Sequence, residues 1–287
     1  MKIILAQDAG YCFGVRNAVE IAYKTARDHG DVYMLGHIVH NEQVVEDLSR
    51  AGAKVVKDLQ SVPEGKPVLF RAHGTANPIW EKAREMNMDI VDATCPLVRD
   101  IHEEVKNLAE AGYRIFIIGD HGHDEVAGIA SQVENAKIIA TPDEARKLSK
   151  VKRAGVVSQS TQTISNVQEI INVLMTKVHD LRFINTICFP TKRNQEQIIN
   201  LAKTCDIVII IGSFTSANSK RLAQLAVQRN PRSYQVTGAK DLDRNWFINI
   251  NTVGISAGAS TPDSVIEEVT QIIEKIAKQQ NQDVSYG

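Results

Sequence analysis

The chain contains one pattern three times: a short apolar run, then a cysteine, then an amphipathic stretch. Cys12, Cys95 and Cys188 occupy this place in the three copies, at similar intervals along the chain. Short β-branched runs are typical of buried parallel strands, and apolar residues three and four apart are typical of helices packed on a sheet. We therefore expect strands over residues 2–6, 90–94 and 183–187, each followed by a helix that begins at the cysteine.

Each copy continues with two further strands that end in polar residues. These strands are expected over residues 32–35, 114–118 and 207–211, and later in each copy over 68–70, 155–157 and 253–255. Alternating strands and helices at this scale predict α/β units. In such units, ligands bind where the carboxyl ends of the strands meet the helix N-termini.

The symmetry of the copies assigns the strand before each cysteine to the preceding unit. The prediction is an α/β fold of three similar domains in a pseudo-threefold arrangement, each offering one cysteine to the centre. The domains are expected over residues 13–94, 95–187 and 188–287, the last completed by the N-terminal strand within 1–12. The tail over 279–287 is expected to be disordered.

Composition narrows the class of protein. The formal net charge of −1 gives no electrostatic reason to expect a nucleic acid or an anionic membrane as partner. The longest aliphatic run, over 207–211, is far too short to span a membrane, and the N-terminus lacks the long apolar region of a signal peptide. Four cysteines without a secretory signal predict reduced thiols and a cytoplasmic protein.

The three repeated cysteines suit an iron–sulfur cluster better than a structural zinc site. No closely spaced cysteine pair of the zinc type is present. Three thiolates from three units can hold such a cluster and leave one iron without a protein ligand. The alternative is that these cysteines are small buried residues at helix starts. Cys205 precedes an apolar strand and is expected in the core.

Polar residues at the ends of the expected strands predict an anion pocket. Imidazoles, hydroxyls, amides and helix N-termini together suit a phosphate or diphosphate group. The candidates are His37, His40, His73, His121 and His123 in the first two units, and Ser216, Asn218, Ser219 and Ser260 in the third. Glu125 is the best candidate proton donor, although a carboxylate at a helix N-terminus equally suits a stabilising role.

Eight segments in order resemble the 4-hydroxy-3-methylbut-2-enyl diphosphate reductase family of the methylerythritol phosphate route to isoprenoids. The resemblance extends over about residues 3 to 275. The segments are AGYCFGV (9–15), VHN (39–41), RAHG (71–74), VDATCP (91–96), GHDEV (122–126), NTIC (185–188), SANSKRL (216–222) and ISAGAS (255–260).

The resemblance implies a trefoil of three α/β domains around a [4Fe–4S] cluster held by Cys12, Cys95 and Cys188. It implies reductive dehydroxylation of an allylic diphosphate to isopentenyl and dimethylallyl diphosphate, with Glu125 relaying a proton. The electrons would come from reduced ferredoxin or flavodoxin, because the chain has no electron-transfer domain of its own. The residues implied to contact the substrate are His40, His73, His123, Ser160, Thr161, Ser216, Asn218 and Ser260.

The chain departs from the family pattern at four places. Asp124 replaces a usual proline beside Glu125, where a second carboxylate is expected to raise the pKa of the acid. Ser160 replaces a threonine but keeps a hydroxyl, and Ala217 replaces a serine, which removes about 1 kcal/mol of diphosphate binding. After the third cysteine, Pro190 and Asn194 replace a small residue and an arginine.

Two other functions remain open from the sequence. A non-catalytic iron–sulfur sensor or carrier would need the three cysteines but not Glu125 or the diphosphate set. A cluster-dependent hydro-lyase would use the open iron but would need no electron donor. Substitution of Glu125 separates the sensor from an enzyme, and activity without a reductant would identify the hydro-lyase.

Overall fold

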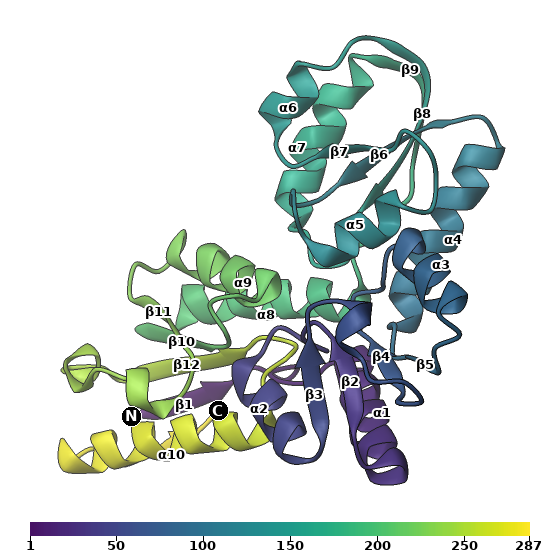
Figure 1. Cartoon of the computed structure of the whole chain (residues 1–287). Helices are drawn as coiled ribbons and strands as arrows, with labels where there is room; N and C mark the ends of the chain where they lie inside the picture. Colours follow the sequence, from purple (N-terminus) through teal and green to yellow (C-terminus); the bar gives the residue numbers. More distant parts are fainter. The chain divides into compact units, whose positions relative to one another are not determined.

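The computed structural model describes all 287 residues and contains three parallel β-sheets flanked by helices (Figure 1). The α/β fold class predicted from the repeated pattern is therefore confirmed. Most helices and strands of the repeats lie close to their expected places, because buried apolar runs and amphipathic spacings are the strongest local signals.

One four-stranded sheet has the order β3-β2-β4-β5. It is formed by β2 (Val32–Leu35), β3 (Ala53–Val56), β4 (Val68–Phe70) and β5 (Ile90–Asp92). The helices of this part of the chain are α1 (Phe13–His29), α2 (Glu42–Arg50), α3 (Asn77–Glu85) and the 3₁₀ turn η1 (Leu59–Ser61). Its core includes Phe70, which contacts Trp80 of α3 edge-to-face.

A second four-stranded sheet has the equivalent order β7-β6-β8-β9. Its strands are β6 (Arg114–Ile118), β7 (Lys137–Ile139), β8 (Val151–Ser158) and β9 (Val178–Phe183). The helices of this part are α4 (Pro96–Glu110), α5 (Asp124–Ala130), α6 (Pro142–Arg146) and α7 (Ile164–Met175). Core side chains from α4 and α5 pack with one set of strand residues, and those from α6 and α7 pack with another.

The third sheet has the order β11-β10-β12-β1-β13. Its strands are β1 (Lys2–Leu5), β10 (Ile207–Ile211), β11 (Ser233–Val236), β12 (Thr252–Ala257) and β13 (Ser285–Tyr286). The helices are α8 (Phe189–Thr204), α9 (Ala217–Val227) and α10 (Asp263–Gln279), with 3₁₀ turns η2 (Ala239–Asp241) and η3 (Arg244–Phe247). The N-terminal strand β1 pairs with β12, as the repeat predicts.

The chain divides into two compact units. One comprises residues 1–15, 40–44 and 189–287 and contains the five-stranded sheet. The other comprises residues 16–39 and 45–188 and contains both four-stranded sheets. The three domain ranges expected from the sequence stay a prediction.

Two local expectations were wrong. The strand expected over 183–187 ends at Phe183, because Thr186 Oγ1 accepts the Ser158 N–H at 2.7 Å and donates to the Ser158 carbonyl at 2.6 Å. These side-chain bonds replace the backbone ladder. The tail expected to be disordered forms β13, in which Ser285 and Tyr286 extend the sheet beside β1.

No helix has both the length and the apolar character needed to cross a membrane.

Candidate active site

The three repeated cysteines occupy the same backbone position in each sheet. Each follows an outer strand of the repeat and stands immediately before a helix: Cys12 before α1, Cys95 before α4 and Cys188 before α8. In each case the cysteine N–H donates to a carbonyl two residues beyond the end of the neighbouring strand. The acceptors are Ala259 for Cys12 (3.3 Å), Ala72 for Cys95 (3.0 Å) and Ser160 for Cys188 (2.9 Å).

The three repeated thiols are more exposed than core residues. Cys12, Cys95 and Cys188 are partly exposed and form no disulfide, so the alternative of small buried residues was wrong. A helix N-terminus favours the thiolate form, which is the form that binds a soft metal. Cys205, by contrast, is buried in the core as predicted, and burial raises the pKa of its thiol.

The thiols fit an iron–sulfur cluster by donor type and by repetition. No three His, Cys, Asp or Glu side chains are placed to hold a single metal ion. A cluster makes a different demand, because each cysteine binds a different iron. The set divides between the compact units: Cys12 lies in the first, and Cys95 and Cys188 lie in the second.

Glu125 is a buried carboxylate held by one neighbouring residue. It lies in the first turn of α5 and is 1% exposed. Its Oε1 accepts the Ser160 N–H at 2.6 Å, and its Oε2 accepts the Ser160 hydroxyl at 2.9 Å. Ser160 follows β8, and its carbonyl accepts the Cys188 N–H, so the carboxylate and a repeated cysteine share one short loop.

Two candidate histidines lie together in the same unit as Glu125. His123 caps α5, and its Nδ1 accepts the Glu125 N–H at 3.2 Å. This bond requires the tautomer in which Nε2 carries the proton. The rings of His73 and His123 meet edge-to-face with centroids 5.8 Å apart. The structure therefore brings together His73, His123, Glu125 and Ser160, as the resemblance implied.

Asp124, the unusual neighbour of Glu125, is bonded elsewhere. Its carboxylate forms a hydrogen-bonded ion pair with Arg71, which follows β4. The two adjacent carboxylates thus have different partners, Arg71 for Asp124 and Ser160 for Glu125. In the sequence, Arg71 belongs to the RAHG segment, which by itself assigns it no role. An unusual acid at one strand end and an arginine at another could together have predicted this ion pair.

Thr161 completes this group. Its hydroxyl accepts a hydrogen bond from the side-chain Nε2 of Gln159 at 3.1 Å, and the side-chain Oε1 of Gln159 accepts the Asp120 N–H at 3.0 Å. Fully buried Gln159 therefore links the loop after β8 to the loop after β6. Sequence reasoning did not single out this residue, because one glutamine in a polar strand end carries no distinctive signal.

The remaining candidates lie in the other compact unit, around the N-terminus of α9. Ser216 caps this helix by accepting the Ser219 N–H at 3.3 Å. Asn218 is 6% exposed, and its Nδ2 donor has no hydrogen-bond partner. A buried amide donor without an acceptor, beside a capped helix N-terminus, is suited to an anion.

Ser260 and His40 meet in the same unit. The Ser260 hydroxyl donates to the His40 carbonyl at 3.2 Å. The next residues continue the polar site: Asn41 caps α2 by accepting the Val44 N–H, and Glu42 accepts hydrogen bonds from Ser213 and Thr215. Glu42 was missed because a single acid at a helix start usually serves only the helix dipole.

Two other histidines of the sequence set are not part of these groups. His121 is exposed and bonds Glu144 at 2.9 Å. His37 is exposed, and its role in the pocket stays a prediction.

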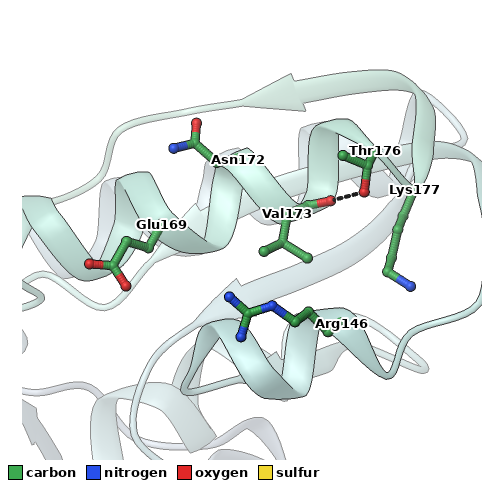
Figure 2. A pocket seen from close by; sticks show the side chains of 6 residues that line it. All are labelled: Arg146, Glu169, Asn172, Val173, Thr176 and Lys177. Carbon is green, nitrogen blue, oxygen red and sulfur yellow. Dashed lines mark hydrogen bonds between the residues drawn. The ribbon is translucent and has the colours of Figure 1, made fainter.

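A pocket of about 520 Å³ in the second unit holds none of the predicted site residues (Figure 2). Its positive groups are already bonded, Arg146 to Asp143 and the Lys177 ammonium to the Leu148 carbonyl. It is lined by Arg146, Glu169, Asn172, Val173, Thr176 and Lys177.

Parallel α/β units with a buried carboxylate at a helix N-terminus, beside polar strand ends, are the architecture of an α/β enzyme. The family model described as "LytB protein" matches residues 3–274 of the chain. The chain therefore belongs to the LytB protein family.

Known relatives match over nearly the whole chain. The 4-hydroxy-3-methylbut-2-enyl diphosphate reductase of Geotalea uraniireducens (strain Rf4) is 41% identical, over 98% of this chain and 100% of that protein. The protein of the same name from Geotalea daltonii is also 41% identical over 98% of this chain and 100% of its own length.

Solved structures agree with this relationship. The E-1-hydroxy-2-methyl-but-2-enyl-4-diphosphate reductase of Plasmodium falciparum has a TM-score of 0.92 at 28% identity, covering 99% of this chain and 91% of that one. A second structure, described as (E)-4-hydroxy-3-methyl-but-2-enyl diphosphate reductase, the terminal enzyme of the non-mevalonate pathway, has a TM-score of 0.70 at 35% identity. It covers 96% of this chain and 100% of its own.

Proposed function

We propose that this chain is a 4-hydroxy-3-methylbut-2-enyl diphosphate reductase, an oxidoreductase of isoprenoid biosynthesis. The observation that carries the function is the full-length relationship to reductases of this name, at 41% identity. The reaction replaces the allylic hydroxyl of the diphosphate by hydrogen. It consumes two electrons and two protons, releases water, and gives isopentenyl and dimethylallyl diphosphate.

Cys12, Cys95 and Cys188 would hold a [4Fe–4S] cluster with one iron free of protein ligands. Their support is the shared backbone position at three helix N-termini, which repeats a thiol environment that favours the thiolate. The bound cluster would supply the electrons to the substrate and a Lewis-acid iron for its hydroxyl.

Glu125 is proposed to deliver the proton that converts the leaving hydroxyl to water. A carboxylic acid can do this only if it is held in place and kept from bulk solvent. Both oxygens of Glu125 are fixed by Ser160, and the side chain is buried. The Ser160 hydroxyl can reverse its hydrogen bond when the carboxyl is protonated, because a hydroxyl both donates and accepts.

The diphosphate is proposed to bind through neutral donors, and each compact unit carries some of the candidates. In one unit the support is the unpaired Asn218 amide at the N-terminus of α9, with Ser216, Ser260 and His40 nearby in the same unit. In the other, His73, His123 and Thr161 are proposed to complete the set, since the Nε2–H of His123 points away from its bond to Glu125.

Electrons are proposed to come from reduced ferredoxin or flavodoxin. The support is the reaction itself, which consumes two electrons, whereas an iron–sulfur cluster passes one at a time. An external carrier delivering one electron at a time would therefore be required twice in each turnover.

The first test measures iron and acid-labile sulfide in anaerobically purified protein, beside Cys95→Ser and Cys205→Ser. We expect about four of each per chain, much reduced in Cys95→Ser and retained in the buried-core control Cys205→Ser. Turnover of the diphosphate substrate by dithionite-reduced methyl viologen then tests the reaction. Activity without any reductant would reject the reductase in favour of a hydro-lyase, and a cluster without activity would favour a sensor.

A further inference from the structure

Phe189 is an aromatic side chain on the surface, directly after a proposed cluster ligand. It begins α8 immediately after Cys188 and is 66% exposed. Phe13 repeats the feature, because it begins α1 immediately after Cys12 and is 52% exposed. A large exposed aromatic side chain contributes favourably to the free energy of binding when a partner buries it. Aromatic side chains are accordingly enriched at protein interfaces.

We call the group of residues around this ring the Phe189 patch. It consists of Phe189, Lys192, Arg193 and Asp8. The Arg193 guanidinium lies 5.6 Å from the centroid of the Phe189 ring. Arg193 also forms an ion pair with Asp8 at 2.9 Å. Asp8 in turn is hydrogen-bonded to Gln197 of α8, so the ring and the guanidinium rest on a connected base within one compact unit.

The charge of the patch is positive where helix stability would favour the opposite sign. Helix N-termini favour acidic residues. The first turn of α8 has none, and Glu196 is the first acid along the helix. Because Asp8 offsets Arg193, the charge of Lys192 and the helix N-terminus remain. An apolar centre with a positive rim is complementary to an acidic protein surface.

We infer that the Phe189 patch is the docking surface for an acidic one-electron carrier protein. The inference rests on the proposed function, because a redox partner is needed only if Cys188 holds the cluster. Phe189 is joined to Cys188 by a single peptide bond, so the patch begins next to a proposed cluster ligand in the chain. Interfaces of electron carriers are small and weak, and one exposed aromatic can therefore dominate them.

The test uses clustered protein and two donors, reduced ferredoxin and dithionite-reduced methyl viologen. Each donor supplies single electrons, and two transfers balance the loss of the hydroxyl as water. For Phe189→Ala we expect the KM for reduced ferredoxin to rise about tenfold, with unchanged turnover per cluster from methyl viologen. Phe189→Glu adds a negative charge, so its KM for reduced ferredoxin is expected to rise further. Its turnover with methyl viologen should not change. The matched control is Ile248→Ala, a 51%-exposed apolar residue after η3 of the same unit.

Direct titration of oxidised ferredoxin, followed by calorimetry, supplies a readout that does not depend on turnover. The dissociation constant should rise by a similar factor in both Phe189 variants and stay unchanged in Ile248→Ala. Unchanged binding and KM in the Phe189 variants would overturn the inference. A loss with both donors at full iron content would also overturn it, by placing Phe189 in the active site. Clustered wild-type protein that fails with methyl viologen would reject the proposed function, and the inference with it.

Discussion

Two bonds to one residue hold the Glu125 side chain, and both come from Ser160. The backbone N–H holds one carboxylate oxygen and the hydroxyl holds the other. The sequence identified both residues, since each lies in a recognisable segment. It could not show that they touch, because 35 residues separate them and only the pairing of β6 with β8 brings their loops together.

Glu125→Gln is expected to lower turnover by 10²- to 10⁴-fold, the usual contribution of a positioned general acid. Glutamine is close in shape and can still accept from Ser160, so iron content should not change. Steady-state rates with methyl viologen and iron analysis would measure the two effects. The control is Asp124→Asn, because the Asp124 carboxylate is bonded to Arg71. This variant should retain most of its turnover. Equal losses in both variants would contradict a special role for Glu125.

His102 of α4 is a closely packed titratable residue, and no sequence motif marks it. Its Nε2 is buried without a partner, and the ring packs against Gly74 and Gly128. Gly74 has a positive φ of 83°, and an added Cβ would lie 3.1 Å from the ring. Burial is the main cause that lowers the pKa of His102 to about 4, and the charge of Lys106 adds to it.

The lowered pKa of His102 predicts a pH-dependent stability. The unfolded chain takes up a proton near pH 6.5, while the folded protein does so only near pH 4. Stability from the neutral ring is therefore complete above pH 6.5 and is lost as the pH falls toward 4, by about 3 kcal/mol.

Urea unfolding of wild type and His102→Gln between pH 4 and 7.5 measures this effect. The difference between their unfolding free energies should shrink steadily as the pH falls. A difference that stays constant would show that the ring does not titrate as its burial demands.

At the scale of elements, helix N-termini position the site. The sequence predicted the helices after the cysteines well, because apolar residues at spacings of three and four leave little choice of periodicity. It failed over residues 184–187, where the apolar residues Ile184 and Ile187 suggested a strand. Thr186 bonds the backbone of Ser158 there, and the Ile187 N–H bonds Asn185. Such local side-chain bonds leave no periodic signal.

Ser216 serves both the helix α9 and the proposed diphosphate. Ser216→Ala should lower the unfolding free energy by about 1 kcal/mol through loss of the cap, and should raise the KM for substrate about tenfold. The matched variant is Thr163→Ala, since Thr163 caps α7 by accepting the Asn166 N–H at the same 3.3 Å. That variant should lose similar stability with no change in KM. Thermal unfolding and initial rates would distinguish them, and a KM change in both would reject the binding role.

At the scale of the whole molecule, the third sheet is built from both ends of the chain. The repeat predicted that β1 would pair with β12, and Ile3 is indeed opposite Val253. The sequence could not predict that β13 pairs with the other edge of β1, because two strand residues in a polar tail carry almost no pattern.

Ile3→Ala tests how much the N-terminal strand contributes to the sheet. Ile3 is fully buried, so its truncation should cost about 2–5 kcal/mol of unfolding free energy. Leu5→Ala, in the same strand but 46% exposed, should cost less than about 1 kcal/mol. Urea denaturation of both variants gives the comparison. Similar costs would mean that β1 is held by its backbone pairing rather than by its core contact.

The main-chain hydrogen bond that recurs at each cysteine bears on how the protein would survive loss of the proposed cluster. Each cysteine backbone is tied to the loop after the neighbouring strand of its own sheet by protein atoms alone. These three bonds join protein atoms to protein atoms, so they hold the cysteine backbones without using the thiols. If oxygen removes the proposed cluster, these bonds should keep the cysteine backbones, and with them the thiols, in place. A new cluster could then be assembled on the same thiols, so inactivation by air would be reversible.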